Sequence, residues 1–543
     1  MRARRPGGPS GAGAAAGASI PEHPPRVRRS LRLARQSRAG IQNSEEASGS
    51  LSELPMEIVE QVLLNCSAPQ LGVLASTAHF FASTGLVERV AKKLVLRHPR
   101  GRGLTVAPRE SWAQLLNYLE LCGNARGAGR TIALGSFHSA LVCRDGPTEA
   151  RALFTAGRGF HGQLGQEDYK NEATHCEVTL PPPDEDFPGA GPAVTCEDEV
   201  VQVACGSSHT AAVTRSGALY TWGLASSGEL GHGGWTPIEL NVPRLVQALM
   251  DTTIVAVSCG ANHTLAVGKC GGLWSCGRGR HGQLGHGHFH DEGPLARVEA
   301  LKEERVQVAS AGATHSMVLC GGGRVFSWGD NRHGQLGHGP QELVANDLTT
   351  NAWPRKVEAL EARFPGAPEE VAGIACGAKH SAAVTTAGKL YTWGRGRTGA
   401  LGLGSREDKG LPSKVPLMGE RPLRPRTLAG LGVRCIKVAC GAGHTVALVH
   451  NPANAWPEVC TTGTNAYGQL GHGGQAPAER ANLLHLKPVK RLQGLQKTIV
   501  DVAAGDDNSA AVTADGRVFV WGRGEWGQLG TGDERSHWAP REI

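Results

Sequence analysis

Residues Gly277–Gly287 read GRGRHGQLGHG, and this stretch decides the fold because near copies of it return six more times. The other copies begin at Gly157, Gly223, Gly329, Gly394, Gly463 and Gly522. A second block, G-x-x-H-[TS], recurs in the same phase with its first glycine at Gly135, Gly206, Gly260, Gly312, Gly377 and Gly441. A seventh copy at Gly505 carries Asn508 in place of the histidine. Self-similarity of this kind indicates repeated supersecondary units rather than isolated motifs.

Each unit is predicted to form four short strands separated by glycine turns. Val201–Cys205 and Thr210–Thr214 are apolar or alternate with a period of two, and Leu219–Gly223 follows them. A fourth strand is marked by proline and an aliphatic residue three positions later, as in Pro243–Val246 and Pro354–Val357. Seven units of four strands predict a mostly β protein with a seven-bladed β-propeller over residues 130–543.

The strand pattern also predicts how the blades pack and how the ring closes. Several units carry two aromatic residues on one side of their third strand, and these should pack between blades. They are Tyr220/Trp222, Phe326/Trp328, Tyr391/Trp393 and Phe519/Trp521. The final segment Trp538–Ile543 has the proline mark, whereas the first unit has no such segment before it. We expect this segment to complete the first blade, which would leave no open sheet edge.

Two motifs inside the repeats invite a chemical interpretation. Gly277-x-Gly279-x-x-Gly282 matches a dinucleotide-binding fingerprint, but it recurs in four units and no helix follows it. We interpret its glycines as turn residues with positive φ. The block histidines are His138, His209, His263, His315, His380 and His444. They have no carboxylate at a catalytic spacing, so we interpret them as buried residues whose ring N–H groups bond to the backbone.

No catalytic constellation is recognised in the repeats, and the 14 cysteines form no C-x-x-C pair or zinc spacing. The sequence therefore predicts no catalytic, cofactor-binding or metal-binding site, and a protein that is not an enzyme. No apolar run reaches the roughly 18 residues that a membrane span needs, so no membrane partner is expected.

Residues 1–50 contain nine arginines, three acids and few large apolar residues, which predicts a disordered basic tail. Its densest charge cluster is Arg26–Arg38. Three interpretations remain open: a passive solvated tail, an arm for nuclear import or for chromatin and nucleic acid, and an organelle transit peptide.

Residues 51–122 change to a helical period, with Trp112, Leu115, Leu116 and Leu119 on one face of the last predicted helix. Within residues 51–98, the segment Leu54–Leu63 reads LPMEIVEQVL, and this stretch resembles an F-box. The resemblance implies docking to a Skp-type adaptor through Leu54, Pro55, Ile58, Val62, Leu63, Leu71, Leu74 and Phe80. Ala78 stands where that family often has cysteine, and the usual later tryptophan is absent. The alternative is a plain helical cap.

The seven in-phase blocks are similar to the regulator of chromosome condensation repeat family, whose members are seven-bladed propellers that serve as binding platforms. Together the two resemblances imply a non-catalytic adaptor in the nucleus or cytoplasm. Such an adaptor would be the substrate receptor of a Skp/cullin-type ubiquitin ligase and hold an unknown target protein on the propeller. The alternative is a guanine-nucleotide exchange factor or chromatin-associated regulator for a Ran-like GTPase. A family member that senses ultraviolet-B light uses tryptophans in G-W-R-H-T runs, and the blocks here lack them.

Overall fold

The computed structural model describes residues 131–144, 151–181, 198–233, 239–339, 350–361, 370–417, 432–454, 456–474, 481–495 and 497–543. It also describes residues 63–67 and 86–97 and the single positions 59, 71 and 116. The chain divides into two compact units, residues 1–62 and residues 63–543. No helix in the described ranges is long and apolar enough to cross a membrane.

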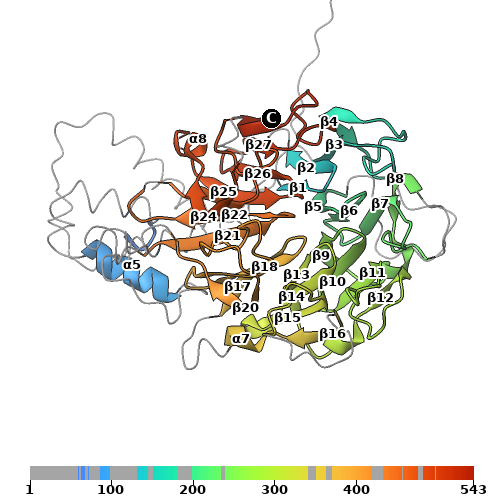
Figure 1. The fold of residues 1–543 in the computed structure, drawn as a ribbon, viewed down its shortest axis with the longest axis horizontal. Helices are drawn as coiled ribbons and strands as arrows, with labels where there is room; N and C mark the ends of the chain where they lie inside the picture. Colours follow the sequence, from blue (N-terminus) through green and yellow to red (C-terminus); the bar gives the residue numbers. More distant parts are fainter. Residues whose placement is uncertain are drawn as a thin grey trace, which may run out of the picture. The chain divides into compact units, whose positions relative to one another are not determined.

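The described strands form seven four-stranded antiparallel sheets arranged around a common axis (Figure 1). The first blade contains β1 (Thr131–Leu134), β2 (His138–Arg144), β3 (Arg151–Gly157) and β4 (Glu172–Val178). The second contains β5 (Val200–Cys205), β6 (His209–Thr214), β7 (Leu219–Leu224) and β8 (Glu239–Leu245). The third contains β9 (Ile254–Cys259), β10 (His263–Gly268), β11 (Leu273–Gly277) and β12 (Glu292–Arg297). The seven-bladed propeller predicted from the repeats is confirmed.

The remaining blades follow the same order along the chain. The fourth contains β13 (Val306–Ala311), β14 (His315–Cys320), β15 (Val325–Asp330) and β16 (Thr350–Lys356). The fifth contains β17 (Val371–Cys376), β18 (His380–Thr385), β19 (Leu390–Gly394) and β20 (Lys409–Lys414). The sixth contains β21 (Arg434–Cys440), β22 (His444–His450), β23 (Glu458–Gly463) and β24 (Leu483–Pro488). The seventh contains β25 (Ile499–Ala504), β26 (Asn508–Thr513), β27 (Val518–Gly522) and β28 (His537–Glu542).

Short helical turns join some blades, and one longer helix precedes the propeller in the chain. The short turns are η2 (Gln247–Leu249), η3 (Glu299–Leu301), η4 (Gly321–Gly323), α7 (Glu358–Glu361) and α8 (Lys490–Gln493). Helix α5 (Leu86–Arg97) buries Val87, Val90, Ala91 and Val95, which share one face at helical spacing. This helix lies within residues 51–122, for which the sequence predicts a helical period.

The first strand of each blade lies nearest the axis, where it contacts the first strands of its neighbours. The fourth strand lies at the outer edge, and in every blade except the first it carries proline, for example Pro243 in β8 and Pro354 in β16. Proline is tolerated there because an edge strand has N–H groups without a ladder partner.

The expected closure through the first blade is wrong. The segment Trp538–Ile543 forms most of β28, and β28 pairs with β27, so it completes the seventh blade. The first blade supplies its own fourth strand, β4, which pairs with β3. Every blade is therefore one continuous segment of chain, and the ring closes through contacts of β1 with β25 and β26 and one bridge between Thr174 and Thr531.

Packing between blades uses the aromatic positions predicted for it. Trp222 is fully buried in a cluster that joins apolar residues of the first two blades, including Val142 and Val203. Its indole N–H donates to the carbonyl of Gln163 in the preceding blade at 3.0 Å. The equivalent tryptophans of the fourth, fifth and seventh blades, Trp328, Trp393 and Trp521, donate in the same way.

The repeated glycines allow a loop of each blade to lie on the outer strand of the next. Gly282 has φ of 75°, and a Cβ there would lie 2.7 Å from the Cα of Ala352 in β16. A side chain would therefore be strained in conformation and would also clash with backbone. Gly277 also has positive φ, at 107°, so the turn interpretation is confirmed for these two glycines. It is wrong for Gly279, which does not have positive φ and is needed because a Cβ there would lie 1.7 Å from the carbonyl oxygen of His290.

Candidate binding face and central cavity

Each block histidine joins its blade to the next one by a buried side-chain hydrogen bond. His315 is fully buried at the start of β14, and its Nε2 lies 2.9 Å from the hydroxyl of Ser381 in the fifth blade. The five other block histidines reach the hydroxyls of Thr210, Thr264, Ser316, Thr445 and Ser509. The structural role expected for these histidines is confirmed, but their partners are side chains of the neighbouring blade rather than backbone groups.

Burial keeps these imidazoles neutral. It lowers the pKa of His138, His263 and His380 to about 3, with the charge of a neighbouring block histidine as a smaller cause in each case. Burial likewise lowers the pKa of His209, His315 and His444 to about 4. A histidine ring that is neutral and bonded to the next blade is suited to a structural role and not to proton transfer.

A second histidine in each of four blades follows the Leu-Gly of the long repeat. His232, His286, His338 and His472 each lie within 3.0 Å of a serine or threonine hydroxyl in the third strand of the same blade. They lie in the loops between the third and fourth strands and are half-buried.

The contact between the seventh and first blades, which we call the seam, departs from this pattern. Asn508 replaces the block histidine, and neither polar atom of its buried amide has a partner among the described residues. Ala156 stands where the other blades place tryptophan, cysteine or threonine. The space is filled instead by His175 of β4, whose Nε2 lies 3.1 Å from the hydroxyl of Ser139. A Cβ at Gly530 would lie 2.0 Å from His175 Nδ1.

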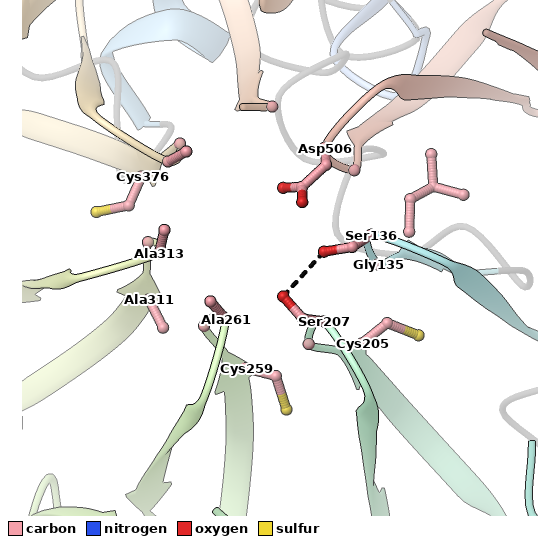
Figure 2. A pocket seen from close by; sticks show the side chains of 18 of the residues that line it. Gly135, Ser136, Cys205, Ser207, Cys259, Ala261, Ala311, Ala313, Cys376 and Asp506 are labelled. Carbon is pink, nitrogen blue, oxygen red and sulfur yellow. Dashed lines mark hydrogen bonds between the residues drawn. The ribbon is translucent and has the colours of Figure 1, made fainter. Parts of the chain in front are cut away.

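A cavity of 130 Å³ lies on the axis where the inner strands end (Figure 2). In six blades the block residue after the first glycine lines the cavity, and in the third, fourth and fifth blades this residue is alanine. The seventh, first and second blades place Asp506, Ser136 and Ser207 there instead, and Ser136 donates to Ser207 at 2.9 Å. Figure 2 shows these three side chains directed into the cavity, whereas the labelled cysteine sulfurs are directed away from it.

The cysteines beneath the cavity are inert. Burial raises the pKa of Cys259 and Cys376 to about 12, so their thiols stay protonated. Within the described ranges, Cys205 and Cys440 also line the cavity, and burial raises the pKa of both thiols. In the same ranges no group of three His, Cys, Asp or Glu side chains is arranged to hold a metal ion.

Beside the cavity, one arginine is enclosed by three aromatic rings from two blades. The guanidinium of Arg158 lies 5.2 Å from the ring centre of Phe137, 4.9 Å from that of Phe160 and 5.2 Å from that of Trp526. Phe160 is 47% exposed and packs edge-on against Trp526. Residues 137, 158, 160 and 526 form what we call the aromatic–arginine cluster.

The charge of Arg158 has no carboxylate partner within the described ranges, and its Nε has no hydrogen-bond acceptor there. The equivalent Arg523 of the seventh blade differs, because it pairs with Glu525 at 2.8 Å and lies 4.6 Å from the ring centre of Tyr467. The cluster therefore combines the exposed ring of Phe160 with a positive charge that no described carboxylate neutralises, and aromatic residues and arginine are enriched where proteins bind one another.

The chain matches the RCC1-like domain over residues 118–422, which is more than half of its length. This chain belongs to the regulator of chromosome condensation family. The regulator of chromosome condensation (RCC1) repeat itself matches residues 458–512 and 515–543.

Curated relatives within the family include proteins of different kinds. The chain is 33% identical to the ultraviolet-B receptor UVR8 of Arabidopsis thaliana over 347 residues, which cover 64% of this chain and 70% of the receptor. It is 31% identical to the E3 ubiquitin-protein ligase HERC2 of Homo sapiens over 396 residues, which cover 72% of this chain but only 7% of that ligase.

Solved structures of the family share the fold. Human WBSCR16 superposes with a TM-score of 0.57 at 24% identity, covering 70% of this chain and 86% of that one. Prp20p from Saccharomyces cerevisiae, which was studied for its binding to Gsp1p and histones, superposes with a TM-score of 0.56 at 18% identity. The match covers 78% of this chain and 89% of Prp20p.

The adaptor-binding residues expected from the F-box resemblance precede the RCC1-like domain, and most lie outside the described residues. Leu63 and Leu71 are described and buried. The others are Leu54, Pro55, Ile58, Val62, Leu74 and Phe80. The Arg-rich segment of residues 26–38 also lies outside the described ranges.

Sequence reasoning missed the cavity acid and the aromatic–arginine cluster. The cluster unites Phe137 and Trp526, which are far apart in sequence and meet only because the ring closes. The available signal was departure from the repeat: at the position of Trp526 the other copies have histidine, serine, threonine or tyrosine. At the position of Asp506 they have alanine or serine.

Proposed function

We propose that this chain is a non-catalytic binding protein that captures a partner protein on the propeller face around the central cavity. The observation that carries the proposal is the aromatic–arginine cluster. The repeat supplies an arginine at this position in other blades as well, but among the described residues only Arg158 lies over three aromatic rings. A partner that covers the exposed ring of Phe160 and supplies an acceptor to the guanidinium would add apolar burial and a charge-assisted hydrogen bond to these contacts.

The partner that fits this cluster presents an acidic side chain next to an apolar one. A carboxylate can accept from the free N–H groups of Arg158, while an apolar group covers Phe160 and Trp526. Arginine that stacks on aromatic rings loses little conformational freedom on binding, which favours a bidentate bond to a carboxylate.

A photo-crosslinking residue at Phe160 of the full chain, expressed in cells, tests this proposal. We expect it to capture a discrete set of proteins, and Arg158→Glu should abolish their capture because it places like charge opposite the partner's acid. The matched control is Lys269→Glu, the same charge reversal in the turn after β10 at the opposite edge of the blades. Capture that is unchanged by Arg158→Glu, or equally reduced by Lys269→Glu, would contradict the proposed binding face.

The finer proposal is that the captured protein is a ubiquitination target. Residues 51–98 would dock on a Skp-type adaptor, and capture would raise the effective concentration of the target beside the ligase. The F-box-like sequence of Leu54–Leu63 supports this proposal, and HERC2, a ubiquitin ligase by name, contains a related propeller.

Co-purification of a Skp-type adaptor with the full chain tests the finer proposal. Pro55→Ala combined with Ile58→Ala should remove the adaptor while crosslinking through Phe160 persists. If the adaptor does not co-purify with the unaltered chain, ligase coupling is refuted and the binding face is unaffected. If the full chain instead accelerates GDP release from a Ran-type GTPase, the exchange-factor alternative replaces ligase coupling.

A further inference from the structure

The central cavity has a chemistry of its own, which the repeats do not dictate. Backbone N–H groups around its rim bond to carbonyls of the next block. Ser207 donates to Ala261, Ala378 to Gly441 and Ala442 to Asp506, at 3.0–3.2 Å. Because these rim N–H groups are already bonded, the side chains that line the cavity have the larger part in deciding which ligand can enter.

The polar side chains that the block position contributes to the lining come from three consecutive blades. They are Asp506, Ser136 and Ser207, and we call this part of the lining the arc. Asp506 is the only charged residue among the described residues that line the cavity, and no hydrogen bond from a described residue reaches its carboxylate. The neighbouring acid Asp507 is engaged differently, because it accepts from Gln469 at 3.1 Å and lies 3.8 Å from Arg523. Burial raises the pKa of Asp507, and the negative charge of Asp506 contributes to the rise. The arc is therefore a region of negative potential.

The number of hydrogen-bond acceptors on the arc equals the number of donors on a primary ammonium group. The Asp506 carboxylate and the two serine hydroxyls provide three acceptors around one space, and an ammonium carries three N–H donors. A planar guanidinium has five donors and would leave some unpaired. One carboxylate and two hydroxyls are too few oxygen ligands for calcium, which takes six to eight. The volume of 130 Å³ can hold a few waters or the end of one side chain.

We propose that the cavity receives one primary ammonium group of the bound partner, with Asp506 as its counter-ion and Ser136 and Ser207 as hydrogen-bond acceptors. This inference rests on the proposed function, because the partner held by the aromatic–arginine cluster is the molecule that inserts the group. Its chemical source is a lysine side chain or a free amino terminus. The partner thus places an acidic group at Arg158 and an ammonium group at Asp506. Because these two groups bind at different places on the face, they fix the orientation of the partner.

The experiment selects binders of the full chain from a display library of random peptides. Selected peptides are synthesised with each lysine, or the amino terminus, either free or acetylated. For the unaltered chain we expect acetylation of one ammonium to weaken binding roughly 10- to 100-fold, the usual effect of losing a charge-assisted hydrogen bond. Asp506→Asn should bind the free and acetylated peptides equally. The lysine and amino-terminus arms identify the source of the ammonium.

Asp507→Asn is the matched control, since it removes the same charge from the adjacent residue and should leave the acetylation effect intact. Three results would each overturn the cavity proposal. The selected peptides lack an ammonium, or acetylation changes their binding to the unaltered chain and to Asp506→Asn by the same factor. The third is that no peptide is enriched for the unaltered chain over the Asp506→Asn variant. If peptides are indifferent to acetylation yet lose binding with Arg158→Glu, the cavity proposal fails and the proposed function stands.

Discussion

At the scale of single residues, the block histidine shows what a repeated polar residue does in a propeller. Its position predicts burial and a structural role, and both are found. Its partner could not be read from one unit, because the hydroxyl that it meets belongs to the next blade. His315 and Ser381 are separated by 66 residues, and only the geometry of the ring brings them together.

The depressed histidine pKa values predict acid-sensitive stability. An unfolded histidine has a pKa near 6.5, whereas the block histidines have folded values of about 3 or 4. As pH falls from about 6.5 towards 4, the unfolded chain binds protons that the folded chain does not, so the free energy of unfolding falls. Each fully buried histidine contributes on the order of 3 kcal/mol to this loss, which is absent above about pH 6.5 and grows as pH falls towards the folded pKa.

Urea unfolding across this pH range measures the effect through the slope of the free energy against pH. His315→Asn should make the slope shallower by about one proton, because asparagine does not titrate. The chain itself uses asparagine at the equivalent position 508, so the substitution is compatible with the fold. A slope identical to that of the unaltered chain would exclude His315 from the titrating set.

At the scale of elements, the seam is where the ring has the fewest repeated contacts. At each of the six other contacts between blades a block histidine bonds to the next blade, and at four of these contacts an indole N–H also bonds back to a loop of the preceding blade. The seam has neither, and His175 of β4 occupies the space of the missing indole. We expect His175→Ala to destabilise the propeller by about 1–3 kcal/mol, because it leaves a void and removes the partner of Ser139.

The replacement of indole by imidazole also predicts a non-additive pair. Ala156→Trp alone should destabilise the propeller, since His175 already fills the space. Combined with His175→Ala, the same substitution should be tolerated, with the indole donating to Gln528 as Trp521 donates to Gln469. Thermal unfolding of both single variants and the double variant measures the coupling. Additive effects would mean that the two side chains do not share the space.

The number of blades and most strand positions could be predicted from the sequence because each depends on local pattern. Glycine turns, period-two apolar runs and proline edge strands are contained within one unit. The seam and the aromatic–arginine cluster could not be predicted in the same way, since they join residues from opposite ends of the propeller sequence. Asn508 and Trp526 differ from their counterparts in the repeat, but the difference alone does not say which residues they meet.

At the scale of the whole molecule, the seventh and first blades exchange no strand. The ring is therefore held closed by side chains and loops that contact each other across the seam. Each blade is a continuous segment, so no strand from one end of the chain is built into a sheet from the other end. The loop of each blade rests on the outer strand of the next, and at the seam Gly527 approaches the backbone of Ala173. Opening at the seam would break contacts between sheets but leave all seven sheets intact.

This topology changes the consequence of removing the C-terminal segment. Deleting Trp538–Ile543 strips β28 from β27 and removes the carbonyl of Trp538 that accepts from Gly473 of the sixth blade at 2.7 Å. Several backbone hydrogen bonds of about 1 kcal/mol each are lost, so we expect destabilisation on the order of 3 kcal/mol. Hydrogen exchange should show the first loss of protection in β27 and in residues 468–473. Earlier loss in β1–β4 would mean that the segment closes the first blade after all, since only then would the first sheet lose an edge.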